Sequence, residues 1–193
     1  GDEGLGFSRG YGYQGGAGRI GWGERIKKPG FGADFKRELR IPGPWYMSLG
    51  GFGEILPYAE NTMRLHPKKR DRFGIPQVTF RFEFGENERR HRKDLVEQGV
   101  KMLEAAGASQ IQSYNEEMIG GAAIHEMGTA RMGQDPRESV VNEHNQVHAA
   151  DNVFVTDGAC MTSASCVNPS LTYMALTARA ADYAVKRLQA GDL

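Results

Sequence analysis

The stretch NVFVTDGACMTSASCVNPSLTYMALTARAADYAVKRL, residues 152–188, predicts a strand, a loop of small residues and a long helix, in that order. The strand, 151–156, is apolar at its centre and is followed by Asp157-Gly158, a pair typical of turns. Asn168 and Pro169 together favour a helix start, with asparagine as the N-cap and proline in the first helical position. Beyond them, apolar residues recur at helical spacing on an alanine-rich face: Leu171, Met174, Ala175, Ala178, Ala181, Val185 and Leu188.

Upstream of this stretch the sequence predicts an antiparallel sheet and a helix. The candidate strands are 45–49, 62–65 and 78–84. In the last of these, aromatic and aliphatic residues alternate with polar ones, which predicts a sheet that is apolar on one side. The residues of the apolar face are Val78, Phe80, Phe82 and Phe84. A helix is expected from Asn87, as its N-cap, to Gly107, where helices commonly stop.

The first 32 residues hold 12 of the 26 glycines, with aromatic residues among them. Because the backbone entropy of glycine opposes helix and strand alike, we expect a mobile segment or a loop lying on another part of the protein. The alternative is a lid, with glycine hinges and aromatic side chains that dock when it closes over a site.

Composition narrows the class of protein. A chain of 193 residues with 24 basic and 24 acidic side chains has no net charge, which argues against a general nucleic-acid binder. No apolar run approaches the roughly 20 residues of a membrane span. Two cysteines, Cys160 and Cys166, make a disulfide framework unlikely, and nothing in the sequence decides between a cytoplasmic and a periplasmic location.

Two residues could carry chemistry. His125 lies in GAAIHEMGTARMG, where small residues on both sides would let a ligand approach, although a lone histidine is more often structural. Asn168 could be only an N-cap, or it could meet a ligand at a helix start whose free N–H groups favour negative charge.

No metal site is expected. His144 and His148 have the four-residue spacing of two ligands on one helix face, but the intervening residues favour helix poorly and no third ligand is evident. His125-Glu126 begins like HExxH, and position 129 is threonine instead of histidine.

Four segments resemble the glucose–methanol–choline (GMC) flavin oxidoreductases. HEMGTARMG resembles the family's His-x-x-Gly-Thr-x-x-Met-Gly motif, and NVFVTDGACM its strand ending in Asp-Gly. NPSLTYMALTARAADYA is similar to the family's terminal helix, which contacts the flavin, and FGEILPYAENTMRL to the sheet region of its substrate domain. These segments are 125–133, 152–161, 168–184 and 52–65. Asn168 stands where many members have histidine, and such His/Asn pairs are found in the choline oxidase, pyranose oxidase and sugar dehydrogenase branches. The small-residue loop and Asn-Pro-Ser-Leu-Thr most resemble the sugar-oxidising branch.

The resemblance implies an α+β fold that corresponds to the C-terminal portion of such an enzyme. Residues 1–32 would form the loop or lid. Residues 33–135 would form the substrate-binding domain, an antiparallel sheet backed by helices. Residues 136–193 would supply the last strand and helix of an FAD-binding Rossmann-like domain. No credible GxGxxG loop follows a strand in this sequence, so the N-terminal FAD-binding segment is expected elsewhere on the polypeptide or on another chain.

The function implied by the resemblance is FAD-dependent oxidation of an alcohol group on a sugar or polyol. His125 would take the hydroxyl proton, a hydride would pass to the flavin, and Asn168 would hold the substrate oxygen. The resemblance places the cofactor against Asp157, Gly158, Ala159, Asn168, Pro169 and Ser170, and it allows an electron-acceptor subunit as a partner. The alternative is a non-catalytic binding or assembly module that keeps the same fold.

Overall fold

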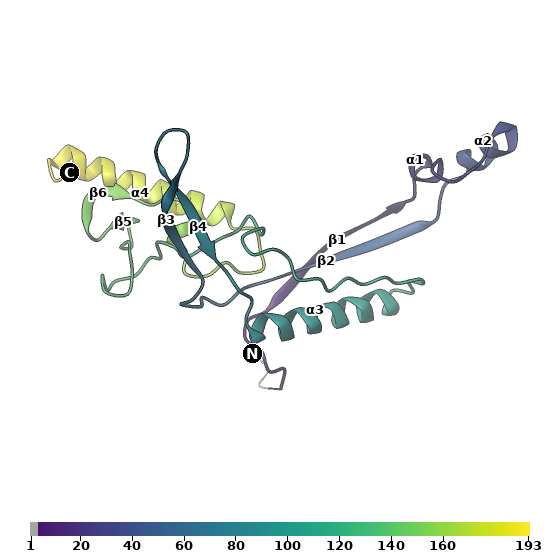
Figure 1. Cartoon of the computed structure of the whole chain (residues 1–193), viewed down its shortest axis with the longest axis horizontal. Coiled ribbons are helices and arrows are strands. Elements are labelled where there is room, and N and C mark those ends of the chain that lie inside the picture. The colour runs from purple at the N-terminus through teal and green to yellow at the C-terminus, as the bar shows by residue number, and fades with distance from the viewer. Residues whose placement is uncertain (1–3) are drawn as a thin grey trace. The chain divides into compact units, whose positions relative to one another are not determined.

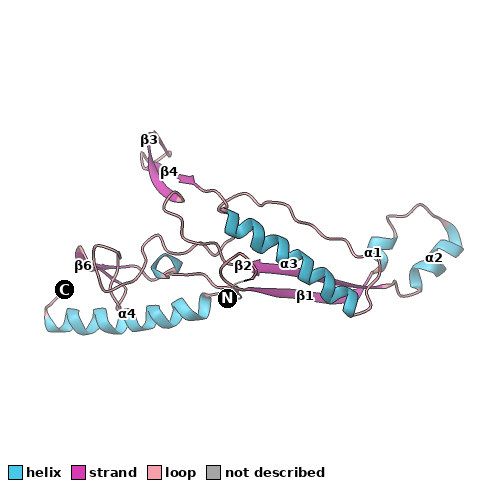
Figure 2. Cartoon of the chain, turned by 90° about the horizontal axis from the view of Figure 1, so that it is seen from below, coloured by secondary structure: helices cyan, strands magenta, loops and turns pink. Residues whose placement is uncertain are grey.

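The computed structural model describes residues 4–193, in which helices and strands are joined by long loops (Figures 1 and 2). The elements are β1 (Tyr11–Arg19), α1 (Trp22–Arg25), α2 (Gly32–Arg40), β2 (Trp45–Gly53), β3 (Thr62–Arg70), β4 (Pro76–Arg81), α3 (Glu86–Ala105), β5 (Gln146–Val147), β6 (Ala150–Phe154), the 3-10 helix η1 (Gly158–Cys160) and α4 (Ser170–Ala190). The chain forms two compact units. Unit 1 comprises the described residues through Tyr11, Gly53–Arg92 and Glu116–Leu193, and unit 2 comprises Gly12–Phe52 and Lys93–Asn115.

In unit 2, the glycine-rich segment forms a strand, β1, which pairs with β2. Gly15 lies so close to β2 that a Cβ at this position would collide with the carbonyl oxygen of Ser48. Small residues thus let the two backbones approach, and this close pairing offsets the entropy that glycine loses on ordering. The expectation that residues 1–32 avoid regular structure is therefore wrong over β1, whereas the lid role stays a prediction.

The C-terminal part of α3 packs on the strands of unit 2. The hydroxyl of Tyr13 donates a hydrogen bond to the carbonyl of Leu95, and a Cβ at Gly99 would lie 3.2 Å from the Tyr13 ring. The helix stops as predicted, because Gly107 adopts φ +80° and the Ala108 N–H donates back to the Leu103 carbonyl at 3.0 Å.

The start of α3, in unit 1, differs from the prediction. The helix begins at Glu86, so Asn87 lies within its first turn and is not the N-cap. The Asn87 Oδ1 instead accepts a hydrogen bond from the Ser8 N–H at 2.7 Å. The asparagine therefore fixes a distant segment of the chain to the helix.

The predicted three-stranded sheet is not formed. In unit 1, β3 and β4 make an antiparallel hairpin with Leu65 opposite Val78, and β2 pairs with β1 and not with β3. The ladder ends at Arg81. Beyond it, the backbone of Glu83 bonds to the Asn61 side chain instead of to β3: Asn61 accepts from the Glu83 N–H and donates to the Glu83 carbonyl.

The apolar face predicted for 78–84 is largely uncovered. Phe80 is 69 % exposed and Val78 is exposed as well. Phe82 and Phe84 lie beyond the ladder, where their rings meet edge to face at 5.0 Å. The alternation predicts the strand correctly, but only Phe82 and Phe84 of this face are half-buried, with Gly120 close to the Phe82 ring.

The C-terminal part of unit 1 contains β5, β6, η1 and α4. β5 and β6 are antiparallel, and the Thr177 hydroxyl on α4 donates to the carbonyl of Thr156 at 2.9 Å. The buried apolar residues of the described chain are Val141, Cys160 and Ala180. The α4 helix begins after Pro169, which occupies the N-cap position, and this corrects the expectation that Asn168 is the N-cap.

The fold is thus a mixture of helices and small two-stranded sheets, two of them antiparallel by register. The assignment of the last strand and helix to an FAD-binding domain stays a prediction. No helix among residues 4–193 combines the length and apolar character that a membrane span requires.

Candidate functional site

The segment that contains His125 lies against the turn after β6. The Ala130 N–H donates to the Ala159 carbonyl and the Met132 N–H to the Cys160 carbonyl, both at 2.9 Å. A Cβ at Gly158 would lie 3.1 Å from the carbonyl oxygen of Glu126, a tight contact that glycine avoids. Two of the segments singled out in the sequence are therefore side by side in unit 1.

Asp157 organises the turn itself. Its carboxylate accepts a hydrogen bond from the Ala159 N–H at 2.9 Å and caps η1. Gly158 and Ala159 are half-buried beneath the His125 segment, while Asp157 remains exposed. The exposed carboxylate keeps acceptor capacity for a hydroxyl group of a ligand.

The loop 161–169 leads from η1 to α4 and carries the remaining predicted contacts. Asn168 is exposed, Pro169 is buried and Ser170, the first residue of α4, is exposed. The N–H groups of Thr172 and Tyr173 donate to the Pro169 carbonyl, whereas those of Ser170 and Leu171 have no acceptor within residues 4–193. This helix start therefore keeps free donors and the positive end of its dipole.

His125 is half-buried, and neither its side chain nor that of Asn168 makes a hydrogen bond or ion pair within the described chain. No hydrogen bond or ion pair among residues 4–193 joins these two side chains. They are linked through the backbone instead. The His125 segment bonds to η1, and the loop that follows η1 leads to Asn168. Both side chains remain available to a ligand.

The two histidines with metal-like spacing serve packing and hydrogen bonding. His148 Nε2 lies 3.0 Å from the Ser139 hydroxyl and 3.2 Å from the Gly133 carbonyl, while the His144 ring stacks on Tyr183 at 3.9 Å. Within residues 4–193, no three His, Cys, Asp or Glu side chains are grouped closely enough to hold a metal ion.

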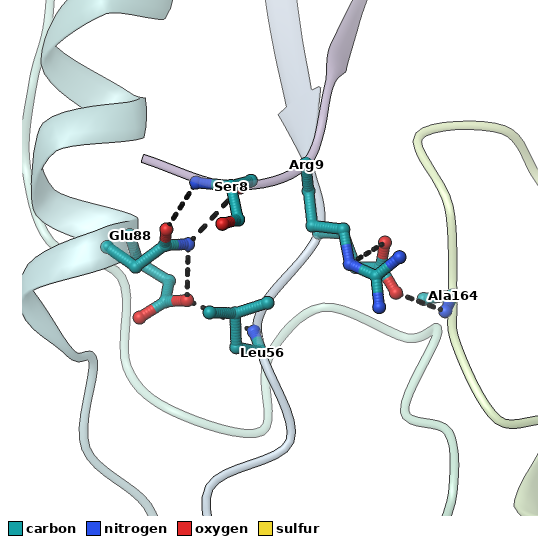
Figure 3. A network of polar contacts seen from close by, with 7 residues as sticks. Ser8, Arg9, Leu56, Glu88 and Ala164 are labelled. Carbon is teal, nitrogen blue, oxygen red and sulfur yellow. Dashed lines mark hydrogen bonds and ion pairs between the residues drawn. The ribbon is translucent and has the colours of Figure 1, made fainter. Parts of the chain in front are cut away.

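Sequence analysis missed Glu54, which comes directly after β2 and is 8 % exposed. Its Oε1 accepts a hydrogen bond from the Ala164 N–H at 3.1 Å, and its Oε2 lies 3.6 Å from the Arg9 Nε (Figure 3). A charged residue set among Phe52, Ile55 and Leu56 in FGEILPY was the available signal, since a carboxylate in such surroundings requires partners.

A second buried carboxylate, Glu88, lies at the start of α3. It accepts a hydrogen bond from the Leu56 N–H at 3.0 Å (Figure 3), and two more from the Tyr58 hydroxyl at 2.9 Å and the Gly85 N–H at 2.8 Å. Burial alone would raise the pKa of Glu88, but hydrogen bonds from Leu56, Asn87 and Tyr58 outweigh burial and hold that pKa below its usual value. The pKa of Tyr58 is raised by burial, and by the hydrogen bond to Glu88 and its charge.

Comparison with known proteins identifies the family. The family model described as GMC oxidoreductase matches residues 57–177, which is more than half of the chain. The protein therefore belongs to the GMC oxidoreductases, and the resemblance found in the sequence is confirmed.

Curated relatives of this family are dehydrogenases and oxidases. The chain is 36 % identical to 2-methyl-1,2-propanediol dehydrogenase of Mycolicibacterium austroafricanum, over 70 % of this chain and 24 % of that protein. It is 31 % identical to the fructose dehydrogenase large subunit of Gluconobacter japonicus, over 72 % of this chain and 25 % of that protein. It is 33 % identical to paromamine 6'-oxidase of Streptomyces fradiae, over 71 % of this chain and 24 % of that protein. The chain thus spans about a quarter of the length of these relatives.

Proposed function

We propose that the protein oxidises an alcohol group on a sugar or polyol, with FAD as its cofactor. The observation that carries the proposal is the bonding of the His125 segment to the Asp157–Cys160 turn, followed by a loop that ends at the open start of α4. The relatives' names support the substrate class, since they include 2-methyl-1,2-propanediol dehydrogenase, a fructose dehydrogenase subunit and paromamine 6'-oxidase.

His125 acts as the general base in this proposal. A neutral imidazole accepts a proton near neutral pH, and this side chain has no protein partner within residues 4–193 that would occupy its nitrogens. Proton removal from the substrate hydroxyl raises electron density on its oxygen, which favours loss of hydride from the neighbouring carbon. Bound FAD supplies the acceptor for that hydride.

Asn168 holds the substrate oxygen in this proposal by donating a hydrogen bond from its side-chain amide. The free N–H groups of Ser170 and Leu171 fit an anionic or oxygen-rich group, because they stand at the positive end of a 21-residue helix. Asp157, Gly158, Ala159, Pro169 and Ser170 would lie along the cofactor, with the Asp157 carboxylate facing a hydroxyl. These residues fit a flavin, which presents both carbonyl oxygens and a hydroxylated chain.

The protein's partners belong to the same proposal. Since the chain spans about a quarter of its relatives, an N-terminal FAD-binding segment, on the same polypeptide or another, completes the site. One relative is named as the large subunit of fructose dehydrogenase, which supports an electron-acceptor subunit as a further partner.

The test is a change of His125 to alanine in the flavin-loaded natural protein. We expect flavin reduction by an alcohol substrate to slow by about 10²–10⁴-fold, the usual contribution of a positioned base, while bound FAD per protein stays constant. Stopped-flow absorbance measures the reduction, with candidate sugars and polyols supplied in turn.

The matched control is His66→Ala. The His66 Nδ1 accepts hydrogen bonds from the Lys68 and Lys69 backbones, a local role in the β3–β4 hairpin, so its loss should leave flavin reduction unchanged. Equal rates in the wild type and the His125 variant would refute the base assignment. A protein that binds FAD but is reduced by no alcohol would instead support the non-catalytic module.

A further inference from the structure

Glu54 is a buried carboxylate whose partners come from two distant segments of unit 1. Ala164 lies 110 positions away in sequence and donates its backbone N–H to Oε1, while the Arg9 guanidinium approaches Oε2 (Figure 3). Burial of a carboxylate is costly unless its oxygens are paired, so these two contacts are what makes a glutamate tolerable here. The hydrogen bond to Ala164 is charge-assisted and is correspondingly strong.

The loop 161–169 has few other anchors. At one end the Met161 N–H donates to the Gly158 carbonyl at 3.1 Å, and at the other Pro169 begins the helix start. From Thr162 to Asn168, Ala164 provides the one hydrogen bond from a backbone N–H to another described residue. Ser165, next to it, has φ +68°, a conformation that a serine adopts at some energetic cost. The loop conformation thus depends on the restraint that Glu54 supplies.

We propose that Glu54 is a positioning residue, which holds the loop 161–169 and through it places Asn168 for substrate binding. The inference rests on the proposed function, in which Asn168 binds the oxygen of the alcohol. Asn168 follows Ala164 by four residues. Loss of the hydrogen bond between the Ala164 N–H and Glu54 therefore lets the Asn168 side chain move away from its substrate-binding position. Arg9 supports Glu54 by balancing its charge.

The first test compares Glu54→Leu and Glu54→Gln with the wild type in the flavin-loaded natural protein. The leucine variant loses both contacts, whereas the glutamine variant keeps an oxygen that accepts from Ala164 and loses only the charge. Hydrogen–deuterium exchange of the peptide over 161–168 should quicken by about tenfold or more in Glu54→Leu and by less in Glu54→Gln. The limiting rate of flavin reduction should fall by about 10–100-fold in Glu54→Leu and by less in Glu54→Gln, because a small displacement of a substrate-contacting group slows the reaction.

Two controls separate positioning from general stability. Glu60→Leu changes an exposed glutamate of the same unit and should leave both the loop exchange and the reduction rate unchanged. Arg9→Gln leaves the buried carboxylate without its counter-charge and should likewise quicken the loop exchange. If Glu54→Leu does not fold, the two glutamine variants still test the proposal, since both are predicted to speed loop exchange measurably.

The second test is a double-mutant cycle with Asn168→Ala. If Glu54 acts through Asn168, Glu54→Leu should slow reduction by less than about twofold once Asn168 is already alanine. An undiminished effect in that background would overturn the positioning role and leave the proposed function standing, as would unchanged exchange over 161–168. No effect of Asn168→Ala alone would overturn the proposed role of Asn168, and the positioning role with it.

Discussion

At the scale of single residues, Glu88 shows how hydrogen bonds can outweigh burial. The carboxylate is 6 % exposed, yet its pKa is held below the usual value by the donors around it. A carboxylate in the first turn of α3 also gains from the helix dipole. The ionised form is therefore the form that stabilises unit 1.

This arrangement predicts a pH dependence with a definite sign. Because the pKa is lower in the folded protein, the unfolded chain binds more protons in acid, and stability falls as pH drops below the ordinary value of 4.5 towards the folded pKa. At neutral pH, Glu88→Gln should cost about 1–3 kcal/mol, since backbone donors lose a charged acceptor. The difference between variant and wild type should shrink on acidification, as measured by thermal unfolding of the natural protein across pH.

The matched control for Glu88 lies two positions earlier. Glu86 is exposed and pairs with Arg90 at 2.9 Å across one helical turn, so Glu86→Gln should change the free energy of unfolding by no more than about 0.5 kcal/mol. A Glu88→Gln variant with the same acid profile as wild type would contradict this account.

Residues with local signals were predicted from sequence, and residues with distant partners were not. His125 and Asn168 stand in recognisable motifs, so the sequence alone identifies them as candidates. Glu54 depends on Arg9 and Ala164, which lie far from it in the chain, and neither periodicity nor spacing reveals such a contact. Asn87 was misassigned for the same reason, because its acceptor oxygen binds Ser8.

At the scale of elements, the pairing of β1 with β2 depends on which glycine faces the neighbouring strand. A Cβ at Gly15 would collide with the Ser48 carbonyl, whereas a Cβ at Gly16 meets nothing within 4 Å. Gly15→Ala should therefore destabilise unit 2 by about 1–3 kcal/mol through overpacking. Gly16→Ala should be neutral or stabilising by up to about 1 kcal/mol, because alanine loses less backbone entropy.

Hydrogen exchange of the β1 and β2 amides in the natural protein measures this pair of variants. Protection should fall in Gly15→Ala and persist in Gly16→Ala. Equal protection in both variants would show that the strands do not approach as closely as the structure places them.

The helices and strands differed in how well the sequence predicted them. The ends of α3 agree within a residue or two, because helical periodicity and a terminal glycine are local signals. β4 was also found from its alternation, but its partner and its burial were not, since both depend on segments elsewhere. β1 was missed because its stability comes from its pairing with β2 and from the hydrogen bond of its Tyr13 to Leu95 on α3, whereas glycine content alone argues against a strand.

At the scale of the whole molecule, apolar surface is the dominant feature. Apart from Pro169, only three apolar side chains are buried among residues 4–193, while large side chains of α4 such as Leu171, at 80 % exposed, face outward. A domain core normally buries far more of its apolar residues than this. The helix was predicted correctly, but the apolar face expected from its periodicity is exposed, and the buried residue of α4, Ala180, was not among those predicted.

The exposed surface predicts the behaviour of residues 1–193 expressed alone. This chain should bind a hydrophobic dye such as ANS, retain no FAD after dialysis and oxidise no sugar, because a dinucleotide-binding loop for the pyrophosphate is absent from its sequence. Flavin fluorescence and dye reduction with several sugars measure the last two properties. Stoichiometric FAD with turnover would show that the 193 residues suffice for catalysis.

The loop 161–169, which Glu54 anchors, also contains a thiol, and this thiol allows the rate of loop motion to be measured. Cys166 is half-buried in that loop, whereas Cys160 is 1 % exposed and burial raises the pKa of its thiol. Alkylating reagents attack the thiolate, so iodoacetamide should label Cys166 well before Cys160. The fluorescence of a probe attached at Cys166 would then report the rate of loop opening. Each time Ala164 separates from the Glu54 carboxylate, the surroundings of the probe change.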